Sequence, residues 1–151
     1  MARAIARCDC EGGPVSISKH AVYTEKLNEI CAAVTARDLE TALEYFDDEC
    51  VVINGAGGIV GDKSALVPGF EEMFAAFPDW TPRVAASFVE GDTIGVLFEV
   101  TGTPGGVGPG VTWIGTGYST FDPETLKIVR DVYFMDEAAL EQKISDSSAI
   151  G

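Results

Sequence analysis

Helical sequence gives way to strand sequence within the stretch Glu72-Met73-Phe74-Ala75-Ala76-Phe77-Pro78-Asp79-Trp80. The spacing of Met73, Phe74 and Phe77 is typical of the last turns of an amphipathic helix. Pro78 ends this helix, because the residue before a proline avoids helical backbone angles. The sequence before the stretch is mostly helical, and the sequence after it predicts a β-meander. This division favours a bent sheet with helices on one face over a parallel nucleotide-binding sheet.

The sequence before this stretch predicts three helices and one short strand. Apolar side chains recur at helical spacing from Tyr23 to Val34, and Asp38 can cap the following helix. Residues 50–54 are rich in β-branched side chains and predict a strand, while Asp62 can cap the third helix. Strands are then expected at residues 83–90, 93–101, 112–121 and 127–135, with a last short helix at 137–144. The predicted fold class is α+β, with helices on one face of a mostly antiparallel sheet.

Length and charge restrict the kind of protein this can be. A chain of 151 residues predicts one domain, which we assign to residues 19–145 between a flexible leader (1–18) and a flexible tail (146–151). The net charge of -14 repels nucleic acid and anionic membrane surfaces. No apolar run approaches the roughly 18 residues of a membrane span. The four cysteines show no disulfide or zinc pattern, so we expect a cytoplasmic location.

The glycines between Asn54 and Asp62 resemble a dinucleotide-binding turn but do not fit its spacing. Gly55, Gly57 and Gly61 are one residue too far apart, and Val60 stands where the third glycine belongs. The strands that follow are linked as hairpins, whereas such a site needs a parallel crossover. The only histidine, His20, lies near the leader, so a cluster of histidine ligands is impossible. We therefore expect no cofactor and no metal.

Two strand faces place polar groups among apolar ones, as the wall of a ligand pocket does. One face carries Glu99 and the other carries Asp131 and Tyr133, and we predict that these three side chains point into one cavity as catalytic groups. Burial there would raise a carboxyl pKa and permit general acid/base catalysis. Two alternatives stay open: both carboxylates face solvent, or Asp131 pairs with Arg130 or Arg83. Neighbours on the same two faces, expected to bind substrate, are Leu97, Thr101 and Met135.

Asn54 and a group of aromatic residues complete the predicted site. Asn54 ends the first strand and could donate a hydrogen bond to a carbonyl or enolate oxygen, although asparagine at this position also initiates turns. The aromatic side chains could line an apolar pocket or pack in the core. They are Trp80, Trp113, Tyr118, Phe74 and Phe77.

Four segments together resemble the SnoaL-like polyketide cyclase family of the nuclear-transport-factor-like superfamily. They are residues 73–80, the strand end Val100-Thr101-Gly102-Thr103, residues 113–121 and residues 127–129. The resemblance covers about residues 23–144. It implies a cone of curved sheet and helices around a deep pocket, a hydrophobic small-molecule substrate, and a homodimer formed through the open sheet.

The resemblance also implies a reaction without cofactor, in which an aspartate on the last strands removes a proton alpha to a carbonyl. Asp131 is the nearest candidate for this base and Glu99 is a second acid/base, while Asn54 and Tyr133 would orient substrate or stabilise an oxyanion. The chain departs from the family at Pro104, where members often carry histidine. The expected function is a cyclase or isomerase of a polyketide- or terpenoid-like molecule. Epoxide opening by Asp131 and Glu99, and a non-catalytic small-molecule-binding module, are the alternatives.

Overall fold

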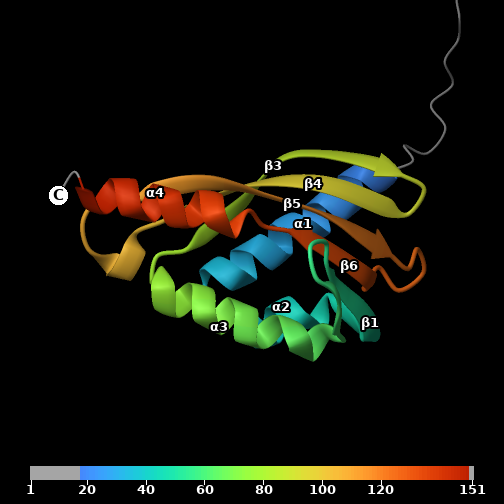
Figure 1. The fold of residues 1–151 in the computed structure, drawn as a ribbon. Helices are drawn as coiled ribbons and strands as arrows, with labels where there is room; N and C mark the ends of the chain where they lie inside the picture. The colour runs from blue at the N-terminus through green and yellow to red at the C-terminus, as the bar shows by residue number, and fades with distance from the viewer. Residues whose placement is uncertain (1–17, 150–151) are drawn as a thin grey trace, which may run out of the picture.

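The computed structural model describes residues 18–149, so most of the predicted leader, including Cys8 and Cys10, lies outside the described residues. Six strands form one sheet in the order β2-β1-β6-β5-β4-β3, which is open at both edges (Figure 1). Only the β1–β6 pair is parallel among these strands. The predicted α+β class with a mostly antiparallel curved sheet is confirmed, and the sheet does not close into a barrel.

The element bounds lie close to those predicted. Within the described residues the helices are α1 (Lys19–Thr35), α2 (Leu39–Glu44), α3 (Leu66–Ala76) and α4 (Glu137–Ala149), with short 3-10 turns η1 (Lys63–Ala65) and η2 (Pro104–Gly106). The strands are β1 (Phe46–Asn54), β2 (Gly58–Gly61), β3 (Thr81–Glu90), β4 (Thr93–Gly102), β5 (Val111–Phe121) and β6 (Ile128–Phe134).

Asp38 caps α2 as predicted, whereas Asp62 caps the 3-10 turn η1 and not the third helix, α3, which begins at Leu66 without a side-chain cap. Asp38 accepts a hydrogen bond from the Thr41 amide at 3.1 Å, and Asp62 accepts one from the Ser64 amide at 2.9 Å to begin η1. The glycines between Asn54 and Asp62 form a hairpin in which β2 pairs back on β1. The predicted turn is confirmed, but β2 is a strand that was not predicted. Helix α4 continues to Ala149, so it extends into the stretch expected to form the flexible tail.

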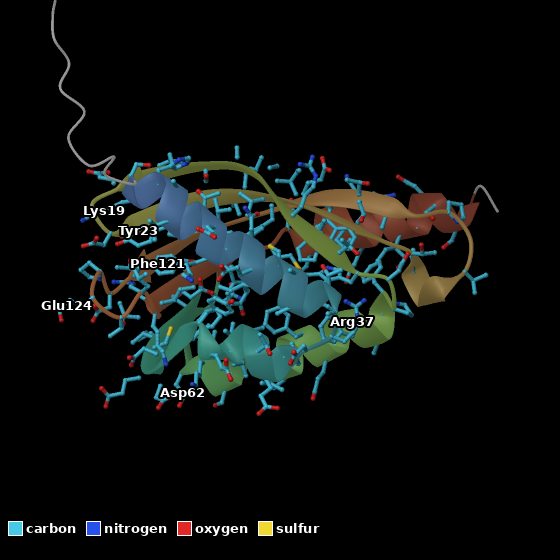
Figure 2. The ribbon with its side chains drawn as sticks, turned by 180° about the vertical axis from the view of Figure 1, so that it is seen from behind. Lys19, Tyr23, Arg37, Asp62, Phe121 and Glu124 are labelled. Atoms are coloured by element: carbon cyan, nitrogen blue, oxygen red, sulfur yellow. The ribbon has the colours of Figure 1, made fainter. Side chains whose placement is uncertain are left out.

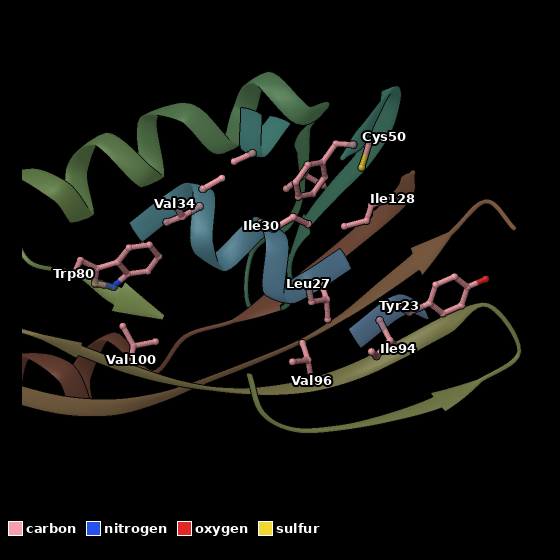
Figure 3. Close-up of a cluster of buried hydrophobic side chains, with 14 of the residues drawn as sticks. Tyr23, Leu27, Ile30, Val34, Cys50, Trp80, Ile94, Val96, Val100 and Ile128 are labelled. Atoms are coloured by element: carbon pink, nitrogen blue, oxygen red, sulfur yellow. The ribbon is translucent and has the colours of Figure 1, made fainter. Parts of the chain in front are cut away.

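The core lies between α1 and one face of the sheet, which we call the inner face (Figure 3). On β4 the residues Ile94, Val96 and Val100 point to this face and are buried. Helix α1 presents Leu27, Ile30 and Val34 to them at helical spacing. The opposite face, which we call the outer face, carries the alternate residues of each strand.

Tyr23 fixes the start of α1 to the far end of the sheet. Its ring stacks on Phe121 with centroids 4.4 Å apart, and Figure 2 shows the two side chains close together. Its hydroxyl donates a hydrogen bond to Asp92 Oδ1 at 2.7 Å, and Lys19 Nζ lies 2.8 Å from the same oxygen. Burial and the Asp92 hydrogen bond raise the pKa of Tyr23 to about 12. The helix is therefore held to the β3–β4 turn by both packing and polar contacts.

The Phe-Pro-Asp-Trp segment joins three parts of the fold. Arg37, in the turn between α1 and α2, donates hydrogen bonds to the carbonyls of Pro78 and Trp80, and its guanidinium lies 4.2 Å from the Phe74 ring centroid. The Asp79 carboxylate accepts hydrogen bonds from the backbone amide and the hydroxyl of Thr103, at 2.6 and 2.7 Å. The stretch that ends α3 thus also fixes the helical layer and the loop after β4.

Candidate functional site

Asp131 lies on the inner face of β6, between the neighbouring strands β1 and β5. The strand register sets it opposite Ser119 on β5 and opposite Val52 on β1. Ser119 Oγ donates a hydrogen bond to Asp131 Oδ1 at 2.8 Å. Ser119 is only 4% exposed, and Val52 is fully buried. The carboxyl group therefore sits against the core, and neither of these neighbours carries a charge.

Burial raises the pKa of Asp131 to about 6, while the hydrogen bond from Ser119 acts in the opposite direction. Among the described residues the Ser119 bond is the only one recorded to this side chain. A carboxylate with a pKa near neutrality suits general base catalysis, because it is a stronger base than an ordinary aspartate and is still largely ionised at neutral pH. The same burial raises the pKa of the Cys50 thiol to about 12, with a smaller contribution from the charge of Asp131.

Tyr133 and Asn54 extend this site along the inner face. Tyr133 follows Asp131 by two residues, so it points to the same face, and it is half-buried against the core. Asn54 is its register partner on β1. Asn54 Oδ1 accepts a hydrogen bond from the Ala56 amide at 2.9 Å, as a turn-initiating asparagine does. Its side-chain oxygen is thus engaged in the turn, and its amide nitrogen is the group that could meet a ligand.

Four of the five predicted aromatic residues pack in or against the core: Phe77, Trp80 and Trp113 are buried, and Phe74 packs against them. Phe77 and Trp113 are buried with ring centroids 4.9 Å apart, so both are core residues. Trp80 packs against Phe74, with ring centroids 5.9 Å apart. Within the described residues, Trp80 Nε1 is the only buried side-chain nitrogen or oxygen without a hydrogen-bond partner. An unmade hydrogen bond of this kind costs about 1–3 kcal/mol.

Glu99 does not lie beside Asp131, so the prediction that both point into one cavity is wrong. Glu99 pairs in register with Arg83 on β3 and with Ile114 on β5, which places it on the outer face. Its carboxylate forms an ion pair with Arg83 at 2.9 Å. The polar face of β4 is therefore a partly solvated sheet surface, so the alternative that both carboxylates face solvent holds for Glu99 but not for Asp131.

Three further predicted contact residues share the outer face with Glu99. Tyr118 is 45% exposed and packs edge-on against Phe134, while Leu97 is 40% exposed. Thr101 is exposed on the same side of β4. Met135 follows the end of β6 and is also exposed. The described contacts do not bring these four residues to Asp131.

Ser119 is the residue at this site that sequence reasoning missed. It is the only polar or charged side chain in the buried class among the described residues. The sequence carries one signal for it: Ser119 alternates with the buried Phe121 on the same face of a predicted strand, where an apolar side chain is expected. Its pairing with Asp131 depends on the register between β5 and β6, which local sequence does not fix.

Residues 18–149 contain no group of three or more His, Cys, Asp or Glu side chains arranged to hold a metal ion. None of their helices combines the length and the apolar character needed to cross a membrane.

Comparison with known proteins identifies the family. A profile of the SnoaL-like domain matches residues 27–131, and the chain therefore belongs to that family. No functionally curated protein matches the chain.

Several solved structures share the fold at low sequence identity. AclR from Streptomyces galilaeus, provisionally described as a hydroxylase, is 20% identical with a TM-score of 0.71, covering 83% of this chain and 97% of its own. IdmH from Streptomyces antibioticus, provisionally described as a polyketide cyclase, is 19% identical with a TM-score of 0.70, covering 82% and 98%. A protein from Jannaschia sp. CCS1, provisionally described as a SnoaL-like polyketide cyclase, is 18% identical with a TM-score of 0.67, covering 89% and 96%.

Proposed function

We propose that this protein is a cofactor-independent cyclase or isomerase of a hydrophobic, carbonyl-bearing small molecule, with Asp131 as the general base. The observation that carries the proposal is the Asp131 carboxyl, which is partly buried on the inner face and held by one hydrogen bond, with its pKa raised to about 6. The substrate class is supported by membership of the SnoaL-like domain family and by the similar structures that are provisionally described as polyketide cyclases.

The proposed reaction begins with proton transfer from carbon to Asp131. The carboxylate takes a proton alpha to a substrate carbonyl, and the electron pair of that C–H bond forms an enolate. In cyclisation, the enolate carbon attacks a second carbonyl carbon of the same molecule, and the resulting alkoxide takes the proton back from Asp131. In isomerisation, the proton returns to a different carbon. Neither route consumes an oxidant, a reductant or a cofactor, and each returns Asp131 to its starting state.

Tyr133 and the Asn54 amide are the polar groups that would hold the enolate oxygen. Both lie on the inner face next to Asp131, and hydrogen-bond donors aimed at a developing oxyanion lower the barrier to its formation. Phe74 and Trp80, which pack against each other, would supply aromatic surface for an apolar substrate. Glu99, Leu97, Thr101 and Tyr118 lie on the other face and have no part in this proposal.

The test uses 5-nitrobenzisoxazole, a probe whose ring C–H proton is removed by a base while its N–O bond breaks to give a coloured nitrophenolate. We expect the protein to accelerate this reaction and Asp131→Asn to lower the rate about 100-fold or more. Glu99→Gln is the matched control, because it neutralises a carboxylate on the opposite face, and it should keep the rate. Full activity in Asp131→Asn, or no acceleration by the unchanged protein, would overturn Asp131 as a base.

Epoxide opening is the second candidate reaction, and its supporting observation is the same partly buried carboxyl. Asp131 would activate water. Glu99 lies on the opposite face of the sheet and cannot protonate the epoxide oxygen, so Tyr133 would have to do so. Styrene oxide in oxygen-18 water separates the two reactions, because hydrolysis places the heavy oxygen in a diol. Binding of an apolar dye with no turnover of either probe would instead support a non-catalytic binding module.

The outer face supports a homodimer as part of the proposal. Large apolar side chains are exposed across it, with Phe88 63% and Ile114 50% exposed. A groove of about 230 Å³ lies among them, lined by Ala86, Phe88, Leu97 and Thr116 together with Ser87 and Val96. The charges of Arg83 and Glu99 cancel there, although the chain as a whole carries a net charge of -14. Two such faces can therefore meet without the repulsion that the rest of the surface would cause.

Sedimentation at micromolar concentration tests the dimer. The protein should sediment as a dimer, and Ile114→Asp should make it a monomer because a charge would be buried at the interface. Ala75→Asp adds the same charge at an exposed position of α3 and should leave the dimer intact. A monomeric unchanged protein would contradict the proposal. A cytoplasmic location also remains part of it, consistent with the free, buried thiols of Cys31 and Cys50.

A further inference from the structure

A residue of the neighbouring strand β5 holds Oδ1 of Asp131 in place. Within the described residues, Oδ2 has no hydrogen-bond partner. Ser119 lies directly across from Asp131 on β5 and donates its hydroxyl hydrogen to Oδ1 at 2.8 Å. The serine is 4% exposed, so water cannot readily replace it as a donor. The two oxygens of the same carboxylate therefore stand in different surroundings.

We infer that Ser119 is a positioning residue that fixes Oδ1 of Asp131 and leaves Oδ2 as the oxygen that accepts the substrate proton. This inference rests on the proposed role of Asp131 as a general base. The serine hydroxyl keeps its hydrogen throughout. When a proton arrives on Oδ2, Oδ1 becomes the carbonyl oxygen of the acid and still accepts the same hydrogen bond, so the carboxyl group keeps its orientation through the reaction.

The hydrogen bond also sets how basic the carboxylate is. A donor bonds more strongly to a carboxylate than to the neutral acid, so Ser119 holds the pKa of Asp131 below the value that burial alone would give. The other titratable groups toward Asp131 on the inner face are Cys50 on β1 and Tyr133 on β6. Cys50 is neutral at pH 7, since its pKa is raised to about 12. Neither of these two groups is a cation, so neither lowers the pKa of Asp131 as the Ser119 hydrogen bond does.

The inference predicts that removing the hydroxyl shifts the titration of Asp131 upward. The carboxyl carbon signal of Asp131, assigned by its absence in Asp131→Asn, is followed by NMR against pH in ¹³C-labelled protein. Ser119→Ala should raise the midpoint by about one pH unit, the size of one hydrogen bond to a charged group. Ser119→Thr keeps a hydroxyl on the same carbon and should restore the midpoint toward that of the unchanged protein.

Thr120→Ala is the matched control, because it removes a hydroxyl from the next residue of β5. That hydroxyl bonds Thr93 Oγ1 at 2.9 Å on the other face, so the Asp131 midpoint should not move. With 5-nitrobenzisoxazole, Ser119→Ala should move the acidic limb of the pH–rate profile, on which Asp131 loses its proton, by the same amount as the NMR midpoint. Its rate on the high-pH plateau should fall about tenfold through lost orientation.

The outcomes separate this inference from the proposed function. An Asp131 midpoint that stays within experimental error in Ser119→Ala overturns the role of Ser119, whatever the activity. A midpoint that shifts as expected in a protein with no Asp131-dependent proton removal supports the Ser119 contact but overturns Asp131 as a base. A shifted midpoint together with an unchanged high-pH rate overturns the orienting role and leaves only the effect on basicity.

Discussion

The inner and outer faces of the sheet carry similar side chains in different surroundings. Each face has isoleucine, glycine, an aromatic residue and one carboxylate on its central strands. On the inner face Ile94 is fully buried and Asp131 has no ionic partner within the described residues, whereas on the outer face Ile114 is half exposed and Glu99 pairs with Arg83. The comparison teaches that burial on the inner face raises the pKa of a carboxyl group, whereas the carboxylate on the outer face is held in a partly exposed ion pair.

Replacing one isoleucine on each face by alanine gives the largest expected difference between the faces in the free energy of unfolding. Ile94→Ala should lower the free energy of unfolding by about 2–5 kcal/mol, because it leaves a cavity beneath α1. Ile114→Ala removes the same atoms from a half-exposed position and should cost about 1 kcal/mol or less in the monomer. Urea denaturation at low protein concentration measures both. Equal losses for the two variants would mean that the outer face is as buried as the inner face.

Replacing one glycine on each face by alanine gives the next largest expected difference in stability. A Cβ at Gly117, on the inner face, would lie 2.5 Å from the backbone carbonyl oxygen of Val132, so β5 and β6 would have to separate. We expect Gly117→Ala to cost about 2 kcal/mol. A Cβ at Gly95, on the outer face, would meet the ring of Phe88, an exposed side chain that can swing into solvent. Gly95→Ala should therefore cost less than half as much, as thermal unfolding of the two variants would show.

Asp131→Asn should stabilise the protein at pH 7 by about 2 kcal/mol. Burial raises the pKa of Asp131 to about 6, so ionising it in the folded state is harder than in the unfolded chain, where an aspartate titrates near 4. The resulting loss of stability is absent below pH 4, grows as the pH rises, and is complete above pH 6. The gain from Asp131→Asn should follow the same course. A variant equally stabilised at pH 4 and pH 7 would contradict this account.

The sequence predicts the elements well because their signals are local. The proline at residue 78 ends α3, Asp38 and Asp62 act as caps, and each meander strand lies within two or three residues of its predicted bounds. The parallel pairing of β1 with β6 was not predicted, because it joins segments that are far apart in the chain. The site depends on this pairing, since it brings Asn54 beside Tyr133.

Only half of the candidate site can be predicted from the sequence, and the reason is physical. Alternation within a strand shows that Glu99 and Asp131 each lie on a mixed face, but it does not relate the faces of different strands. That relation depends on the register, which shifts at irregularities between Val84 and Ala86 and between Thr120 and Phe121. On β4 the wholly apolar face turns inward, and on β6 the face with Asp131 does. Ser119 becomes visible as a partner only after this register is known.

The smallest effect is expected for the outer carboxylate, and it sharpens the comparison most. Glu99→Gln removes an ion pair whose arginine is 64% exposed, so it should cost less than about 1 kcal/mol, and less still in high salt. Its sign is opposite to that of Asp131→Asn, although the two substitutions are chemically identical. Chemical denaturation of both variants at pH 7, at low and high salt, gives four values. A stabilising Glu99→Gln would show that the outer carboxylate is also desolvated, and the difference between the faces would then not lie in their access to water.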